Sequence, residues 1–251
     1  GGVLGLAPHS LRAVTPEELD FAAELGGSGP IHIHVAEQVK EIDDCIAWSG
    51  ARPVEWLLDH ADVSERWCLI HATHMTEEET RRMAKSGAIA GLCPITEANL
   101  GDGTFPAPQF LEEGGRYGIG SDSNILIAVP DELRQLEYSQ RLALRARNVI
   151  APTSGSTGRA LYEQSVAGGG IALGAPTGLS QGRTADLVSL DVSAVPYLSG
   201  DQLLDQWLFA SGVSVDSVWA FGRKQVSGGR HVKRDAIKGN FLAAMQRLVS
   251  A

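Results

Sequence analysis

The chain has 251 residues, of which 43% are hydrophobic and 20% charged, and its formal net charge is −9 at pH 7. This composition is typical of a folded globular protein, and no apolar run approaches the roughly 18 residues of a membrane span. The acidic balance argues against nucleic-acid partners, because phosphate binding needs clustered Lys and Arg. Only three cysteines occur, without a CxxC pair, which favours a reducing compartment, so we expect a cytoplasmic protein.

The first 150 residues alternate short apolar runs with helix-like segments, a pattern that predicts parallel strands joined by helices. The predicted strands are residues 3–7, 31–35, 68–71, 88–92 and 118–121. Capping boxes at Thr15 and Thr76 mark two helix starts. The strand spacing of roughly 30 residues is that of a (β/α)8 barrel, although five strands cannot close one.

The remaining residues show a different pattern of predicted elements. Residues 131–148 have helical apolar spacing, the polar stretch 152–158 predicts a loop, and a further helix ends in the glycines 168–170. Residues 185–190 predict a strand, 218–226 a hairpin and 233–249 an amphipathic helix. We therefore expect a barrel portion at 1–175, part of a small β domain at 176–232, and a C-terminal helix at 233–251.

His32 and His34 stand two residues apart in the predicted strand 31–35, so their side chains share a face. Neutral imidazole binds zinc or iron, and Glu37, just past the strand, is placed to accept a proton from metal-bound water. For an isolated His-x-His, two hydrogen-bonded core histidines are the alternative.

Further polar residues follow the neighbouring strands. His71 ends the run 68–71, and Asp122 follows the run 118–121. Catalytic groups of barrels collect at the carboxyl ends of the strands, so these two residues and His34 could converge on one metal ion. The alternative for Asp122 is a helix cap.

His9 and Arg12 follow the first predicted strand and would stand at the same rim. An arginine there can bind a carboxylate through two hydrogen bonds. The alternative is a surface arginine near a helix start.

Five segments together resemble the formimidoylglutamate deiminases of the amidohydrolase superfamily. They are LAPHSLR (6–12), HVAEQ (34–38), WCLIHATH (67–74), GLCPITEANLGDG (91–103) and GSDS (120–123). Each segment is common by itself, but their joint order and spacing are specific. The resemblance implies an α/β fold, namely the carboxyl-terminal part of a metal-dependent (β/α)8 amidohydrolase barrel plus part of a small β-sandwich domain.

The resemblance also implies roles for particular residues. His34 would be the metal ligand on strand five and Asp122 the ligand on strand eight, while Glu37 would shuttle the proton. His71 would be the strand-six histidine beside the metal, so that Glu37, His71 and Asp122 form the catalytic set. One divalent ion is implied, zinc in the first place, with iron as the alternative.

The implied substrate is a small molecule, held by His9 and Arg12. The sequence leaves the oligomeric state open, with a homodimer as one alternative. The implied reaction is hydrolysis of N-formimino-L-glutamate to N-formyl-L-glutamate and ammonia. A second hypothesis is deamination of a cyclic amidine such as guanine or another aminopurine, but only 6% of the residues are aromatic. A third is a catalytically silent fragment, because the family's first His-x-His pair is expected upstream of Gly1, and two ligands hold a metal weakly.

Overall fold

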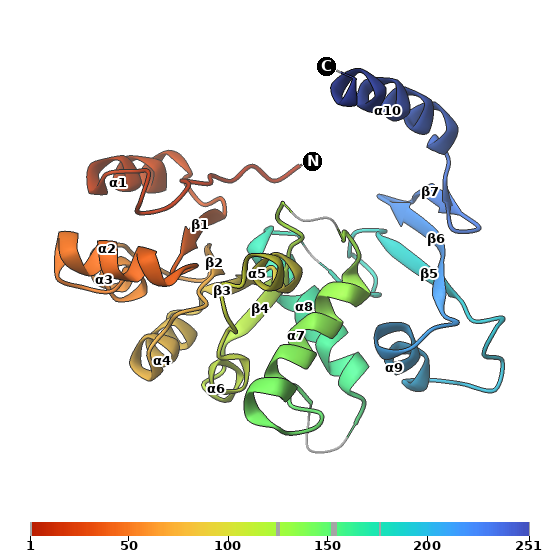
Figure 1. Ribbon diagram of the computed structural model, residues 1–251, viewed down its shortest axis with the longest axis horizontal. Coiled ribbons are helices and arrows are strands. Elements are labelled where there is room, and N and C mark those ends of the chain that lie inside the picture. The colour runs from red at the N-terminus through yellow and green to blue at the C-terminus, as the bar shows by residue number, and fades with distance from the viewer. Residues whose placement is uncertain (1, 124–125, 152–154, 176, 251) are drawn as a thin grey trace. The chain divides into compact units, whose positions relative to one another are not determined.

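The computed structural model describes residues 2–123, 126–151, 155–175 and 177–250. The chain divides into two compact units, Gly1–Gly178 and Leu179–Ala251, which are described separately (Figure 1). In these ranges, no helix combines the length and the apolar character that a membrane crossing requires.

The first unit is built on a parallel sheet with strand order β1-β2-β3-β4. Its strands are β1 (Ile31–Val35), β2 (Trp67–His71), β3 (Ile89–Leu92) and β4 (Arg116–Ile119). Its helices are α1 (Pro16–Leu25), α2 (Val39–Ser49), α3 (Pro53–His60), α4 (Glu77–Ser86), α5 (Pro94–Leu100), α6 (Ala107–Glu112), α7 (Val129–Leu144) and α8 (Thr157–Ala172). In Figure 1 the colour runs from red to green through these alternating elements. The predicted parallel sheet with helical connections is therefore confirmed.

Local sequence explains where the first helices begin. Thr15 accepts a hydrogen bond from the Glu18 amide while the Glu18 side chain bonds back to Thr15, and Thr76 and Glu79 do the same. These reciprocal bonds satisfy amides that have no partner within the helix. Both predicted capping boxes are thus confirmed.

The core of this unit lies between the sheet and its helices. Alternate residues of β1, Ile31, Ile33 and Val35, are fully buried, as are Leu57 of α3 and Leu69 of β2. Burying such a side chain stabilises the fold by about 1.5–3 kcal/mol. This packing fixes the strands and hence the positions of the residues at their ends.

Helix α8 approaches β4 closely enough that only glycine fits at one position. A Cβ atom on Gly168 would lie 1.9 Å from the carbonyl oxygen of Tyr117. Tyr117 is itself buried, and its hydroxyl donates to the Leu161 carbonyl of α8 at 3.2 Å. The glycines 168–170 lie within this helix, which continues to Ala172, so the prediction that the helix ends at them was wrong.

Three other predicted boundaries also need correction. Within the described residues, the segment 3–7 makes only isolated bridges, Leu6 to Ile31 and, further on, Ser10 to His34; Pro8 between them lacks an amide hydrogen. The strand predicted at 118–121 is β4, which ends at Ile119. Of the loop predicted at 152–158, residues 152–154 lie outside the described residues, and α8 begins at Thr157 because the Ser156 hydroxyl caps the Arg159 amide.

The second unit holds an antiparallel sheet of order β5-β6-β7-β8. Its elements are β5 (Leu187–Asp191), α9 (Gln202–Phe209), β6 (Ser214–Ala220), β7 (Arg223–Ser227), β8 (Arg230–His231) and α10 (Arg234–Val249). The hairpin predicted at 218–226 is β6 and β7, joined by Phe221 and Gly222, which both have positive φ as a two-residue hairpin turn requires. The predicted final helix forms, but none of its side chains is buried.

Candidate functional site

Five polar side chains gather at the carboxyl ends of the parallel strands. His34 lies in β1 and Glu37 just beyond it, His71 ends β2, Cys93 follows β3, and Asp122 follows β4. Carboxyl ends of parallel strands share one edge of a sheet. The structure therefore brings His34, Glu37, His71 and Asp122 together as the sequence predicts, and adds Cys93, to which the sequence assigned no role.

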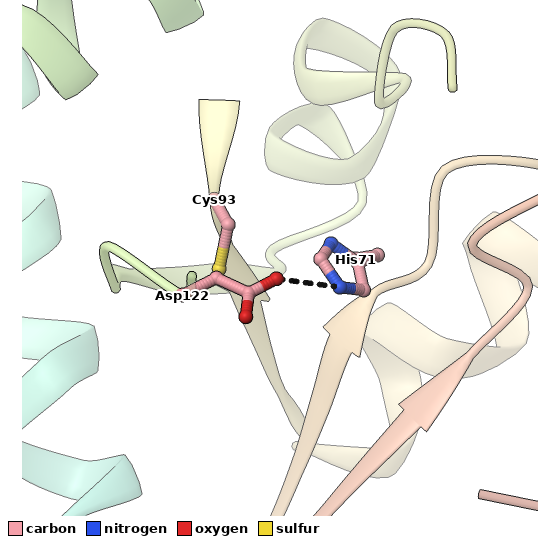
Figure 2. A group of neighbouring side chains, drawn as sticks. All are labelled: His71, Cys93 and Asp122. Atoms are coloured by element: carbon pink, nitrogen blue, oxygen red, sulfur yellow. Dashed lines mark ion pairs between the residues drawn. The ribbon is translucent and has the colours of Figure 1, made fainter. Parts of the chain in front are cut away.

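His71 is the centre of this group and is fully buried. Its Nε2 atom lies 3.8 Å from Oε1 of Glu37 and 3.6 Å from Oδ2 of Asp122, while its Nδ1 lies 3.3 Å from Oε1 of Glu97. Figure 2 shows the Asp122 carboxylate turned toward the imidazole, with the Cys93 sulfur beside it. Among the described residues, Nε2 of His71 has no hydrogen-bond partner.

Glu97 is a functional neighbour that sequence reasoning missed. Its buried carboxylate accepts the Cys93 amide at 3.0 Å and contacts His71 through the same oxygen. Burial lowers the pKa of His71, but the hydrogen bond and charge of Glu97, with the charges of Glu37 and Asp122, outweigh burial and raise it. The only sequence signal was an acidic residue in the first turn of α5 after Pro94, which is also common in ordinary helix starts.

We expect Glu97→Gln to lower the pKa of His71 in the metal-free protein, because the amide keeps an acceptor but removes the charge. A raised pKa in the folded state adds stability below the unfolded-state pKa of about 6.5, and this stability is lost as the pH rises through the folded-state pKa. The variant should therefore lose unfolding free energy at about pH 6 relative to about pH 9. NMR titration of His71 and denaturant unfolding at both pH values measure this.

Glu163→Gln is the matched control, since Glu163 pairs with Arg159 on an exposed face of α8. An unchanged His71 pKa in Glu97→Gln would contradict the role assigned to Glu97.

His34 has its ring held by the backbone. Nδ1 lies 2.7 Å from the carbonyl oxygen of His9, which can only accept, so Nδ1 carries the proton. In the neutral ring Nε2 is then the lone-pair nitrogen, the arrangement found in metal-binding histidines. The His34 and His71 rings are stacked with centroids 5.6 Å apart. His32, by contrast, makes a structural contact, with Nε2 2.8 Å from the Ala172 carbonyl.

Arg12 and His9 also stand at this edge. Nη2 of Arg12 donates to Oε2 of Glu37 at 3.0 Å and lies 3.9 Å from Glu41. The His9 ring lies 5.0 Å from that of His34, and its Nδ1 is 2.8 Å from the Ser10 hydroxyl. Arg12 thus contacts the carboxylate of Glu37 in this state, whereas the sequence predicted a contact with a substrate carboxylate.

Glu41 fixes the turn that carries Glu37. Its buried carboxylate accepts the amide of Ala36 at 3.0 Å and that of Glu37 at 2.9 Å. Ala36 has a φ of 52°, in the left-handed region. Sequence reasoning missed Glu41, since an acid in the first turn of a helix is usually only a favourable charge.

The left-handed conformation recurs at the end of β2 and beyond the end of β4. His71, Ala72 and Asp122 have φ values of 68°, 47° and 48°. For residues with a Cβ this costs about 1–2 kcal/mol each, so the surrounding contacts must hold them there. Asp122 is not a helix cap, because the next helix, α7, is capped at Ala128; instead, its Oδ1 accepts the Ser123 amide at 2.7 Å.

The donors at this edge include ligands that a divalent metal ion accepts; among the described residues, those that lie within 4.8 Å of one another are on His71, Cys93 and Asp122, with His34 outside that group. The lone-pair nitrogen of His34 and the Asp122 carboxylate are ligands that zinc and iron accept. A buried nitrogen without a partner, such as Nε2 of His71, is costly unless a ligand or water contacts it. The edge of the sheet can thus hold a cation and place a carboxylate and an imidazole beside it.

Comparisons with protein families and with known proteins identify relatives of this chain. The model of the "Amidohydrolase family" matches residues 1–228. The chain is 50% identical over 256 residues to "Formimidoylglutamate deiminase" of Pseudomonas aeruginosa, covering 99% of this chain and 56% of that protein. The chain thus spans about half the length of this curated relative.

Solved structures give a similar result. An amidohydrolase from Brucella melitensis matches with a TM-score of 0.96 and 64% identity, over 98% of this chain and 55% of the other. An adenosine deaminase from Xanthomonas campestris, solved with bound zinc, matches with a TM-score of 0.87 and 24% identity, over 98% and 57% of the two chains. The latter similarity concerns the fold alone.

Proposed function

Because the chain belongs to the amidohydrolase family, we propose that it carries part of the active site of a deiminase that hydrolyses N-formimino-L-glutamate to N-formyl-L-glutamate and ammonia. The observation that carries this proposal is the convergence of Glu37 and Asp122 on Nε2 of His71. The relative that is 50% identical, a formimidoylglutamate deiminase, supports the choice of substrate.

We further infer that β1 to β4 correspond to strands five to eight of a (β/α)8 barrel, and β5 to β8 to part of a small β domain. The parallel order of β1 to β4 supports this, as does the fold similarity to the solved amidohydrolase and adenosine deaminase, of whose chains this chain covers 55% and 57%. From His34 to Asp122 is 88 residues, 122 minus 34, close to three strand-helix units of roughly 30 each. In this reading the boundary between the barrel part and the β domain falls near residue 176, close to the division of the two compact units after Gly178.

His34 and Asp122 would hold the metal, with zinc as the first candidate because neutral imidazole and carboxylate are ligands that zinc accepts. A divalent ion at such a site lowers the pKa of water toward neutrality and polarises the bond that is attacked. Nε2 of His71 and Oδ2 of Asp122, 3.6 Å apart, then orient the attacking water. Their positions decide the direction from which water approaches the formimino carbon.

Glu37 moves the proton. Its carboxylate accepts a proton as the water oxygen bonds to the formimino carbon and gives it to the nitrogen, then takes the remaining proton of that oxygen and gives it to the same nitrogen, so that the carbon–nitrogen bond breaks, ammonia leaves and the formyl carbonyl forms. The Glu41 bonds to the backbone of Glu37 keep the carboxylate in place during both transfers. His71, fixed by Glu97, stays beside the tetrahedral carbon and donates toward the charge that develops there.

Arg12 and His9 would hold a carboxylate of the substrate. The guanidinium of Arg12 is placed to bind a carboxylate at this edge, since it already binds the carboxylate of Glu37 at 3.0 Å. Holding the remote end of the substrate converts binding energy into alignment of the reacting end.

We expect Arg12→Met to raise KM for N-formimino-L-glutamate by about 10–100-fold, since a hydrogen bond to a charged group contributes about 1.5–3 kcal/mol. Steady-state kinetics of ammonia release measure this. Lys40→Met is the control, because Lys40 pairs only with the exposed Asp44 in the contacts that the structure records. If KM rises equally in the control, or stays unchanged in Arg12→Met, Arg12 does not bind the substrate.

The decisive experiment measures ammonia release from N-formimino-L-glutamate and, in parallel, from guanine, before and after chelation of metal and after zinc is restored. Metal-dependent turnover of the linear substrate alone supports the proposal, while turnover of guanine alone would replace it with purine deamination. A cytoplasmic homodimer stays a prediction, which cell fractionation and analytical ultracentrifugation test.

A further inference from the structure

We propose that His71, Cys93 and Asp122 form a second cation site, which takes one thiophilic divalent ion such as Zn²⁺ or Cd²⁺ and blocks the active site when it is filled. The binding part of this proposal stands on the geometry alone. The blocking part rests on the proposed function, because His71 and Asp122 belong to the catalytic set.

The three residues offer one nitrogen, one sulfur and one oxygen that lie within 4.8 Å of one another (Figure 2). An ion at the centre of these donors lies at most about 2.8 Å from each. Shifts of well under 1 Å would bring the donors to the zinc distances of about 2.0–2.3 Å. Side chains at strand ends can make such shifts without moving the sheet.

The buried Nε2 of His71 points independently to a ligand. It is fully buried and has no hydrogen-bond partner among the described residues. Nδ1 faces the Glu97 carboxylate at 3.3 Å and can donate to it; an incoming ion displaces to solvent the proton with which Nε2 donates in the proposed reaction, and this exposes the lone pair of Nε2. An ion beside that lone pair would satisfy the nitrogen, which is costly to bury without a partner.

The Glu97 carboxylate contacts both Cys93 and His71 and so fixes their positions relative to each other. Oε1 of Glu97 accepts the Cys93 amide at 3.0 Å and also faces Nδ1 of His71. The thiol is buried and has no part in the proposed reaction. Burial raises its pKa, as do the charges of Glu97, Asp122 and Glu132 and the neighbouring Cys68, so the incoming ion displaces one proton to solvent as the metal–sulfur bond forms.

The second site shares Asp122 with the catalytic site but uses sulfur in place of His34. A soft ion therefore prefers the second site, because thiolate selects soft and borderline metals. Once bound, it occupies Nε2 of His71 and draws Asp122 away from the catalytic ion. Excess zinc should consequently inhibit turnover.

The test is a titration of the metal-free protein with Cd²⁺, followed by ultraviolet absorption and ¹¹³Cd NMR. We expect a thiolate-to-cadmium charge-transfer band that saturates, with a cadmium shift that indicates one sulfur ligand. Cys93→Ser should lose the band, whereas Cys45→Ser, at an equally buried thiol in α2, should keep it. Circular dichroism and thermal unfolding establish that both variants are folded.

The cadmium NMR signal of the unaltered protein shows whether sulfur binds the ion, even if Cys93→Ser does not fold. A cadmium shift without sulfur, or a charge-transfer band that survives in folded Cys93→Ser, overturns the site. Activity is followed separately with rising zinc in an enzyme that contains the whole active site: a sulfur-ligated ion without deiminase turnover in that enzyme rejects the proposed function alone. Turnover that excess zinc does not reduce, despite the sulfur-ligated ion, rejects the inhibition.

Discussion

Replacing Glu37 by glutamine in an intact enzyme is expected to lower kcat for N-formimino-L-glutamate by about 10²–10⁴-fold, the usual contribution of a general acid-base group. The amide is nearly isosteric with the carboxylate but cannot accept the proton. Glu37 lies 3.8 Å from Nε2 of His71 and is oriented by Arg12 at 3.0 Å and by Glu41. The turn that carries Glu37 is held by hydrogen bonds from the backbone amides of Ala36 and Glu37 to Glu41. These bonds do not involve the Glu37 carboxylate, so the turn should persist in the variant.

Metal content and kinetics must be measured together on this variant. Atomic absorption should find as much zinc in Glu37→Gln as in the unaltered protein, because Glu37 is not among the proposed ligands. Glu163→Gln, on an exposed face of α8, controls for the general effect of replacing a glutamate. Turnover that stays unchanged at full metal occupancy would remove Glu37 from the mechanism.

Gly168→Ala is expected to destabilise the protein by about 1–3 kcal/mol or more, the range for inserting a methyl group into a well-packed core. Its Cβ would lie 1.9 Å from the Tyr117 carbonyl oxygen and 3.0 Å from the Tyr117 nitrogen. These are backbone atoms of β4, so relief requires α8 and β4 to separate. Since β4 leads to Asp122, activity should fall with stability.

The neighbouring Gly169 is a matched control, because a Cβ there would meet no heavy atom within 4 Å. In a helix interior, replacing such a glycine by alanine stabilises by about 0.5–1 kcal/mol. Thermal unfolding should therefore move in opposite directions for the two variants, by about 2–4 °C for each kcal/mol. Equal shifts for both would mean that the close approach of α8 to β4 is not what constrains Gly168.

Sequence patterns predicted the parallel sheet because its strands are nearly continuous apolar runs between capped helices. They also predicted that His34, His71 and Asp122 would meet, since each stands at or near the carboxyl end of a strand. Glu41 and Glu97 could not be predicted in the same way. Their roles depend on which amides and imidazole they face across the folded chain, and sequence spacing does not encode that.

The errors have local physical causes. Residues 3–7 are apolar enough for a strand, but Val3 and Leu4 stay exposed and the pairing with β1 is limited to isolated bridges. Helix α8 begins inside a stretch that looks like a loop, because the single Ser156 hydroxyl suffices as its cap. Cys93 was overlooked because a lone cysteine carries no spacing signal, and only the meeting of three strand ends gives it neighbours.

Two alanines in the left-handed conformation at the strand ends affect both the stability of the fold and the catalytic residues beside them. Ala36 and Ala72 have φ values of 52° and 47°, a conformation that glycine adopts without a steric penalty. Glycine at either position would relieve strain in the folded state but loosen the chain beside Glu37 or His71. Laboratory evolution toward thermostability should therefore accept glycine at these positions only when selection for turnover is relaxed, and turnover selection should restore alanine.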